Sequence, residues 1–115
     1  MILAVSAIGL VFAQGPNPAA LNDAATQHAQ AKRFDEAEKL WKRAIELQPA
    51  FFPALFNLAF LYFSTSRYDR AEPLLVRSAK LQPDNFNVHY LLGTARVSLG
   101  RRDEGLVAWR AALAL

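Results

Sequence analysis

The apolar residues between positions 35 and 47 recur at intervals of three and four along the chain. They are Ala37, Leu40, Trp41, Ala44, Ile45 and Leu47. Because side chains at this spacing share one face of an α-helix, the pattern predicts an amphipathic helix that buries that face. Asp35 followed by Glu38 is typical of a helix start, since both side chains can accept hydrogen bonds from backbone N–H groups at the helix N-terminus. Pro49 predicts the end, because proline disfavours the helical conformation in the residue before it.

The same pattern returns 34 residues later. The stretch RFDEA at residues 33–37 recurs as RYDRA at 67–71 and, in weaker form, as RRDEG at 101–105. Residues 35–49 and 69–83 are identical at eight of fifteen positions, where about one identity is expected between unrelated segments of ordinary composition. The repeat predicts a second helix that starts at Asp69, with Glu72 three residues later. Pro73 is placed in its first turn, where the missing N–H group has no partner inside the helix.

Each period also contains an earlier helical segment. We expect these helices over about residues 18–31, 53–64 and 87–99, with Pro18 and Pro53 suited to a first helical position. Two antiparallel helices of this length cannot bury their apolar faces alone, so neighbouring pairs must stack. The prediction is an all-α protein, a solenoid of antiparallel helix pairs. It contains about two and a half to three repeats, at residues 18–51, 52–85 and 86–115.

This helix-pair unit resembles the tetratricopeptide repeat over residues 18–115. The matching residues are Leu21, Ala24, Ala25, Ala37, Trp41, Ala44 and Pro49 in the first repeat, Leu55, Leu58, Ala59, Tyr62, Ala71, Leu75, Ser78 and Pro83 in the second, and Leu92, Gly93, Gly100, Trp109 and Ala112 in the third. His28, His89, Arg96 and Gly105 depart from the family pattern. The resemblance implies a right-handed solenoid whose first helices line a concave face and bind an extended or helical peptide of a partner protein.

Small and bulky residues alternate between the two helices of each pair. The small residues are Ala25, Ala59 and Gly93 in the first helices, and the bulky residues are Trp41, Leu75 and Trp109 in the second helices. We expect the small residues to let the paired helices approach closely and the bulky ones to fill the space opposite.

The candidate groove residues lie on the face of each first helix that the pairing does not use. They are Asn22, Thr26 and Ala29 in the first repeat, Phe56, Asn57, Phe60 and Phe63 in the second, and Tyr90, Thr94 and Val97 in the third. An aromatic stripe in the groove would favour a protein or peptide partner with apolar side chains. The alternative is core packing, because the helix at residues 53–64 is apolar almost all round.

Asn57 resembles the asparagine with which some family members hold the C-terminal carboxylate of a partner. Those members also use lysine and arginine, whereas Asn22, Asn87 and Leu91 stand at the companion positions here. We therefore expect no carboxylate clamp.

The first residues have a different composition. Residues 2–12 are apolar and uncharged, and residues 11–13 form a small-x-small stretch, which is typical of a secretory signal segment with its cleavage site. The prediction is a signal segment at 1–13, a linker at 14–17, and export to the periplasm or outside the cell. No lysine or arginine precedes the apolar run, so the alternatives are a buried N-terminal helix and a cytoplasmic protein. The run is too short to span a membrane, and no membrane contact is expected once the segment is removed.

Composition excludes several classes of function. The 115 residues include no cysteine, and the net charge of +3 arises from 13 basic and 10 acidic residues that are interleaved. The absence of cysteine excludes thiolate nucleophiles, and the weak charge does not favour nucleic acid. His28 and His89 have no acidic residue at metal-binding spacing, and the glycines form no phosphate-binding loop. The chain is therefore expected to be neither an enzyme nor a binder of metals or cofactors.

Arginines occupy the turn within each repeat. Arg33, Arg67, Arg101 and Arg102 each stand close in sequence to Asp35, Asp69 or Asp103. We expect screened local pairing with these aspartates rather than an anion site.

The last helical segment ends on apolar residues. Leu106, Val107, Leu113 and Leu115 have no following polar segment in the sequence, whereas terminal repeats of solenoids usually carry a polar cap. The alternatives to a groove-binding module are self-association through this face, a longer array, or the accessory repeats of a larger protein such as an enzyme.

Overall fold

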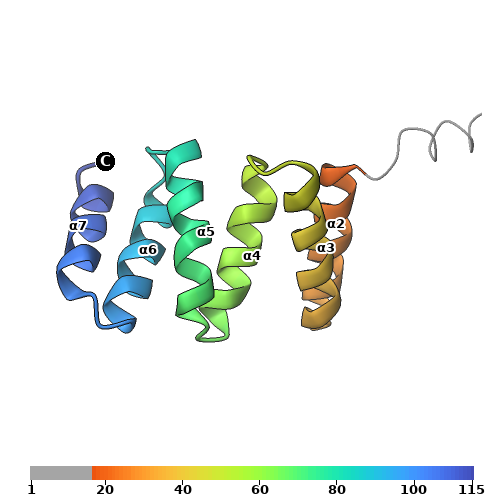
Figure 1. The fold of residues 1–115 in the computed structure, drawn as a ribbon, viewed down its shortest axis with the longest axis horizontal. Coiled ribbons are helices and arrows are strands. Elements are labelled where there is room, and N and C mark those ends of the chain that lie inside the picture. Colours follow the sequence, from red (N-terminus) through yellow and green to blue (C-terminus); the bar gives the residue numbers. More distant parts are fainter. Residues whose placement is uncertain (1–16) are drawn as a thin grey trace, which may run out of the picture.

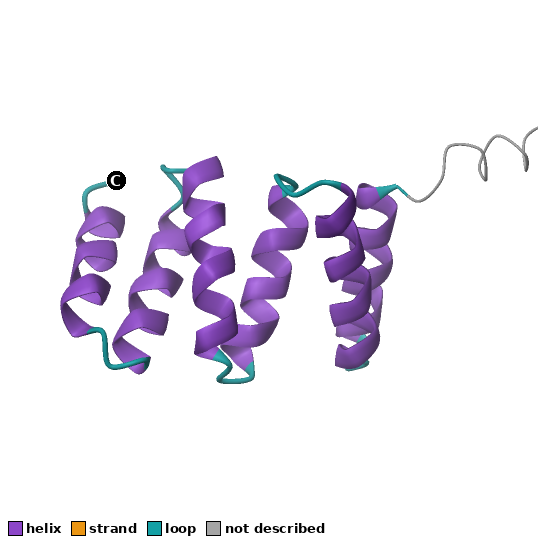
Figure 2. Ribbon diagram, in the orientation of Figure 1, coloured by secondary structure: helices purple, strands orange, loops and turns teal. Residues whose placement is uncertain are grey.

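The computed structural model describes residues 17–115, which form six α-helices arranged as three stacked pairs (Figure 1). They are α2 (Pro18–Gln30), α3 (Phe34–Leu47), α4 (Phe52–Ser64), α5 (Tyr68–Leu81), α6 (Phe86–Ser98) and α7 (Arg102–Leu113). Figure 2 shows only helices and loops in this part of the chain. The all-α prediction and the antiparallel pairs α2–α3, α4–α5 and α6–α7 are confirmed. The predicted signal segment at residues 1–13 lies outside the described residues.

The first helices of the pairs lie on the inner side of the stack. Each helix packs against the next along the chain, and α4 also contacts α2 and α6 directly. By contrast, α3, α5 and α7 do not contact one another within residues 17–115. The first helices are therefore closer together, and α2, α4 and α6 line the concave face that the resemblance implies.

The core lies where the paired helices cross. Ala25 and Ala59 are completely buried, as is Leu75. At Gly93, a Cβ atom would lie only 2.2 Å from Cδ1 of Trp109, which no side chain could tolerate without movement. The predicted close approach is confirmed at Gly93, and Ala25 and Ala59 are buried, as the prediction requires.

The aspartates do not cap the second helices, so that part of the prediction is wrong. The helices begin one residue earlier, at Phe34 and Tyr68, and the capping residues Arg33 and Arg67 make no side-chain capping bond. Asp35 and Asp69 lie inside the first turn. A carboxylate there still interacts favourably with the helix dipole.

The second helices start before the aspartates because of the geometry of the preceding turn, which recurs every 34 residues. Lys32, Ser66 and Gly100 have left-handed backbone conformations, with φ of 61°, 61° and 82°. Each turn is closed by a backbone bond of 2.8 Å from the next residue to a carbonyl near the end of the first helix. This closure determines where the second helix starts, without help from an aspartate side chain.

Pro73 lies inside α5 rather than in its first turn. Because the helix starts at Tyr68, the carbonyl of Asp69 loses the N–H group that residue 73 would otherwise supply. Pro73 is exposed, so the ring is tolerated at the surface.

Replacing Pro73 with alanine should therefore stabilise the protein by about 1 to 3 kcal/mol, because alanine restores the N–H donor and has a far better helix propensity. Urea unfolding followed by circular dichroism would measure the change. Pro53, at the start of α4, is the matched control, since alanine there restores no intrahelical bond. A lower midpoint for Pro73→Ala would contradict the prediction.

Candidate functional site

The inner face carries almost no charge. Asp23 is the only formally charged residue of α2 at neutral pH, α4 has none, and α6 has only Arg96. The guanidinium of Arg96 lies 3.4 Å from a carboxylate oxygen of Glu72, so its charge is partnered within the protein. A ligand on this face therefore meets mainly apolar and neutral polar groups.

Two columns of stacked aromatic rings run along the first helices. In α4, the Phe52 and Phe56 ring centroids are 5.6 Å apart and those of Phe56 and Phe60 are 6.5 Å apart. In α6, the rings of Phe86 and Tyr90 are 6.0 Å apart. Phe60 is 51% exposed and Tyr90 is 50% exposed, whereas Phe56 is half-buried. The aromatic stripe thus has both an exposed part and a part that packs on the core.

Asn22 links three helices beneath this surface. Its side-chain oxygen accepts hydrogen bonds from the indole N–H of Trp41, at 2.9 Å, and from the amide of Asn57, at 3.0 Å. All three predicted polar groove residues of the first two repeats are partly buried: Asn22, Thr26 and Asn57. We did not predict from the sequence that Trp41 donates to Asn22. The signal that could have indicated it is the polar Asn22, 19 positions before a buried tryptophan.

A cavity of about 390 Å³, which we call the inner cavity, lies between the first two repeats. It is lined by Thr26, Ala29 and Gln30 of α2, Phe34 and Trp41 of α3, and Asn57, Phe60, Leu61 and Ser64 of α4. The structure therefore brings together the predicted residues Thr26, Ala29, Asn57 and Phe60. The lining is mainly apolar, with amide and hydroxyl groups at Asn57, Gln30, Thr26 and Ser64.

The other predicted groove residues have different surroundings. The Phe63 ring packs edge-on against Tyr68, with centroids 5.4 Å apart. Thr94 donates a hydrogen bond to the carbonyl of Tyr90. Val97 lies against Gly105, where its Cγ2 would be 2.5 Å from an added Cβ atom. These three residues are absent from the lining of the inner cavity.

A second cavity, the end cavity, has a volume of about 430 Å³ and lies between α6 and α7. Phe86, Tyr90, Trp109, Ala112 and Leu113 line it. Leu113 is 81% exposed, and Val107 and Leu115 are also exposed. The apolar surface that the sequence places on the last helix is therefore open in the described residues.

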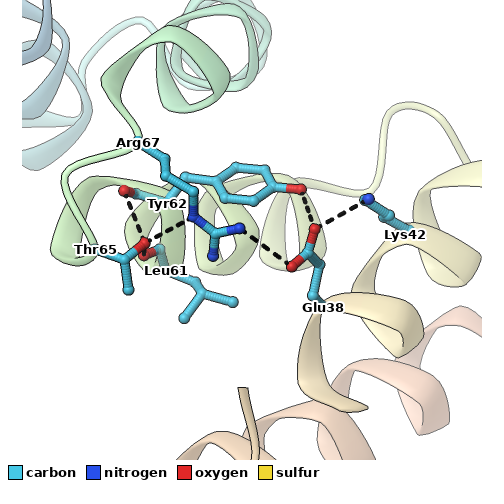
Figure 3. Close-up of polar contacts among 6 residues, drawn as sticks. All are labelled: Glu38, Lys42, Leu61, Tyr62, Thr65 and Arg67. Atoms are coloured by element: carbon cyan, nitrogen blue, oxygen red, sulfur yellow. Dashed lines mark hydrogen bonds and ion pairs between the residues drawn. The ribbon is translucent and has the colours of Figure 1, made fainter. Parts of the chain in front are cut away.

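Glu38 connects the first repeat to the second, as Figure 3 shows. It accepts a hydrogen bond of 2.7 Å from the Tyr62 hydroxyl and forms ion pairs with Lys42, at 3.0 Å, and Arg67, at 3.5 Å. The Arg67 guanidinium also lies 4.6 Å from the centre of the Tyr62 ring. A glutamate on α3, the second helix of the first pair, thus binds two residues of the α4–α5 pair.

The second repeat is joined to the third in the same way. Glu72, 34 residues after Glu38, pairs with Arg96 and Arg101. The expected pairing of the turn arginines with their neighbouring aspartates is therefore wrong for Arg67 and Arg101, which reach back to the preceding repeat. In the first turn, Arg33 donates instead to His28.

These contacts affect the acid–base behaviour of the first junction. Partial burial alone would raise the pKa of Glu38, but the bonds from Tyr62 and Lys42 and the charge of Arg67 outweigh it and lower the pKa below its ordinary value of 4.5. Burial, with the nearby Glu38, raises the pKa of the Tyr62 hydroxyl above 10.0. The contribution of Glu38 to stability is thus present above pH 4.5 and lost as pH falls through its lowered pKa. That of Tyr62 is present below pH 10.0 and lost as pH rises through its raised pKa.

Glu38→Gln should therefore cost about 1 to 2 kcal/mol at pH 7, because hydrogen bonds to a charged acceptor are lost. It should also weaken the loss of stability on acidification. Urea unfolding at pH 7 and at about pH 3 would test both effects. Glu36→Gln, an exposed position on the same helix, is the control. An acid dependence identical to that of the unmodified chain would contradict the assignment.

Both histidines contact polar groups of the chain itself. His28 accepts the bond from Arg33, and Nε2 of His89 lies 2.6 Å from the carbonyl of Pro83. Within residues 17–115, no group of three or more histidine, aspartate or glutamate side chains could hold a metal ion. None of the helices in this part of the chain is long and apolar enough to cross a membrane.

Comparison with known proteins identifies similar sequences and folds. A family model of the tetratricopeptide repeat matches residues 28–95, more than half of the chain. None of the curated proteins compared with the chain is significantly similar to it in sequence.

Several solved structures are similar. MamA of MSR-1 is 31% identical with a TM-score of 0.81, and MamA of AMB-1 is 29% identical with a TM-score of 0.84; each match covers 90% of this chain. The matches cover 59% and 56% of those MamA chains, which is less than two thirds of their length. The second TPR of Spaghetti (RPAP3), bound to the HSP90 peptide SRMEEVD, is 21% identical with a TM-score of 0.79, over 86% of this chain and 92% of that one. At that identity, the likeness concerns the fold alone.

Proposed function

The chain belongs to the tetratricopeptide repeat family, whose fold is that of a protein-interaction module, and from this premise we propose that its concave face binds a partner segment rich in apolar side chains. The face is formed by α2, α4 and α6. The candidate contact residues on it are Phe56, Phe60 and Tyr90, with Thr26 and Asn57 at the inner cavity.

One observation carries the proposal: an aromatic column with an exposed end stands beside an apolar cavity on a face with almost no charge. Phe60 belongs to both, since it ends the column of α4 and lines the inner cavity. A ring that is half exposed on a folded protein loses contact with water when a partner covers it, and each Å² of apolar surface buried contributes about 25 cal/mol. Contiguous exposed apolar surface of this kind marks interaction sites.

The charge of the face argues against an acidic partner. The peptide bound to the RPAP3 domain, SRMEEVD, contains three acidic residues. On α2, α4 and α6 of this chain, the only arginine or lysine is Arg96, and Glu72 already neutralises it. A carboxylate placed on this face would lose its hydration without gaining a cationic partner. An uncharged segment pays no such cost.

The proposal can be tested by selecting binders of the full chain from a random peptide library and measuring their affinities. We expect the selected peptides to be rich in apolar residues and poor in acidic ones. Phe60→Lys should weaken them by about tenfold or more, a change of about 1.4 kcal/mol, because it places an ammonium group where an apolar contact was made. Leu81→Lys, on the outer helix α5 and 41% exposed, is the matched control and should leave the affinities unchanged.

Two results would count against the proposal. One is the selection of acidic peptides, which would indicate a site other than the uncharged face. The other is a set of peptides that respond equally to the substitutions at Phe60 and Leu81, because such binding would not involve the groove.

We also propose self-association as a second function, because a specific surface favours it. The end cavity and the exposed Leu113 that lines it form an apolar surface on the last helix pair, and Val107 is exposed elsewhere on the same helix. If copies associate there, the mass in sedimentation equilibrium should rise with concentration, and Leu113→Glu should abolish the rise. A monomer at all concentrations would remove this second function and leave the first unaffected.

A further inference from the structure

We infer that the inner cavity takes one aromatic side chain of the partner, of the size of phenylalanine, and thereby sets the position of the bound segment. The inference rests on the proposed function and names the side chain that the concave face selects.

The 34-residue period shows what fills the equivalent place one repeat further along the chain. Phe63 and Tyr68 occupy in the second repeat the positions of Ala29 and Phe34 in the first. In the second repeat, the Phe63 ring meets the Tyr68 ring edge-on, with an interplanar angle of 79° and centroids 5.4 Å apart. In the first repeat, Ala29 offers only a methyl group beside Phe34, and both residues line the inner cavity. The first repeat thus lacks the ring that the second repeat supplies from its own chain.

The third repeat fills this place differently. Val97 stands at the position of Ala29 and Phe63, and its side chain packs against Gly105 on the facing helix. Among the three described repeats, the first has the smallest side chain at this position. The inner cavity therefore lies in the repeat whose side chain at this position is the smallest of the three.

The surroundings of the cavity fit an aromatic ring. The Phe34 and Phe60 rings are 42% and 51% exposed, so both present free surface, and Trp41 and Leu61 contribute buried apolar surface. The volume of about 390 Å³ exceeds the roughly 150 Å³ of an apolar cavity that can hold benzene. Aromatic pairs prefer edge-on or offset stacked arrangements and gain energy beyond the burial of area. Among residues 17–115, no charged residue lines the cavity, so a charged side chain would be desolvated without a partner.

The two tryptophans provide separate reporters for a test on the full chain. Trp41 lines the inner cavity and Trp109 lines the end cavity. The probe is N-acetyl-phenylalaninamide, titrated into ¹⁵N-labelled protein while the two indole N–H signals are followed by NMR. We expect the Trp41 signal to shift and saturate, and the Trp109 signal to move much less. N-acetyl-leucinamide should bind about threefold or more weakly, because it lacks the ring interaction, and N-acetyl-glutamic acid amide should cause no saturable shift.

Substitutions then test the comparison between repeats. Ala29→Phe copies the second repeat and should fill the cavity from within, which abolishes the Trp41 response. Ala20→Phe, the same change at an exposed position of α2 outside the cavity, should preserve it. If Ala29→Phe does not fold, Phe34→Ser removes one aromatic wall at a residue that is 42% exposed, and the probe should then bind about threefold or more weakly. Phe34→Tyr retains the ring and should retain binding.

Equal shifts at Trp41 and Trp109, equal binding of the leucine and phenylalanine probes, or an undiminished response in Ala29→Phe would each overturn the inference. Its failure is distinguishable from that of the proposed function. If library peptides bind Phe60→Lys more weakly but bind Ala29→Phe normally, the groove function stands and the aromatic anchor is wrong. If Phe60→Lys leaves the peptide affinities unchanged, the groove function is wrong, whether or not N-acetyl-phenylalaninamide binds the inner cavity.

Discussion

Replacing Gly93 with alanine is expected to destabilise the protein by about 2 kcal/mol, although alanine is the better helix former. The gain in helix propensity is about 1 kcal/mol, whereas overpacking costs about 1 to 3 kcal/mol, and so short a contact with Trp109 places the cost at the upper end of that range. The added Cβ would lie 2.2 Å from Cδ1 and 2.6 Å from Nε1 of Trp109, so the rigid indole must move. Urea unfolding followed by circular dichroism would measure the loss. A variant as stable as the unmodified chain would show that the helices do not cross so closely.

The first repeat suggests a rescue for this variant. There Ala25 and Trp41 coexist at the equivalent positions, and the indole N–H of Trp41 is bound by Asn22. In the third repeat Tyr90 stands at the position of Asn22, and the Trp109 indole instead lies 3.3 Å from the Tyr90 carbonyl. Tyr90→Asn introduced together with Gly93→Ala should recover at least about half of the lost stability, because it supplies the same acceptor. Tyr90→Asn alone should bring no comparable gain.

Trp41→Ala is expected to cause the largest loss, about 3 to 5 kcal/mol, because it deletes a bulky core side chain and leaves a void. Trp41 is only 4% exposed, and its substitution also removes one of the two donors to Asn22. Such a loss is a large part of the roughly 5 to 15 kcal/mol that stabilises an ordinary domain. Circular dichroism at 222 nm during thermal and urea unfolding would follow it without relying on tryptophan fluorescence.

Trp109→Ala is the matched control, since Trp109 has the same position in its repeat but is only half-buried. We expect it to lose about half as much stability as Trp41→Ala, in proportion to the smaller apolar area removed from water. Equal losses in the two variants would indicate that Trp109 is covered as fully as Trp41. That outcome would contradict the open surface described for α7.

The fold could be predicted because its main determinants are local and repeated. The spacing of Ala37, Trp41 and Ala44 defines a buried helix face, and the 34-residue period carries that face through the chain. The opposition of Gly93 and Trp109 could also be predicted, because a small and a bulky residue recur together at fixed positions. Periodic patterns record which face is buried, and the burial of apolar surface is the main force that drives such helices together.

Helix ends and polar pairs were less predictable. The aspartate at residue 35 has the composition of a cap but lies inside the helix, because the turn at Lys32 determines the start. Arg67 stands two residues from Asp69, yet its partner is Glu38, 29 positions earlier. Long-range side-chain contacts depend on how the helix pairs are stacked, and sequence proximity does not report that geometry.

The sequence predicted which helices line the candidate site but not which of their residues do. Thr26, Asn57 and Phe60 line one cavity as members of a common face, whereas Phe63 at similar spacing packs on Tyr68. The difference depends on which side chain of the paired second helix faces each residue, and the helical pattern of the first helix alone does not contain that information. Ala29 lines the inner cavity at the position where the second repeat has Phe63. This difference is seen only when the two repeats are aligned.

The bridge from Glu38 to Tyr62 and Arg67, repeated as Glu72 to Arg96 and Arg101, has a consequence for how such a chain can grow. A tandem copy of residues 52–85 inserted after residue 85 would set Glu72 against a new Tyr62 and Arg67, and every junction would keep its glutamate and the donors that bind it. A tandem copy of residues 86–115 would instead set Leu106 there, because leucine occupies the place of the two glutamates. Of these two segments, the middle repeat is therefore the one whose duplication would lengthen the array without a mismatched joint, and engineered extensions are expected to start from it.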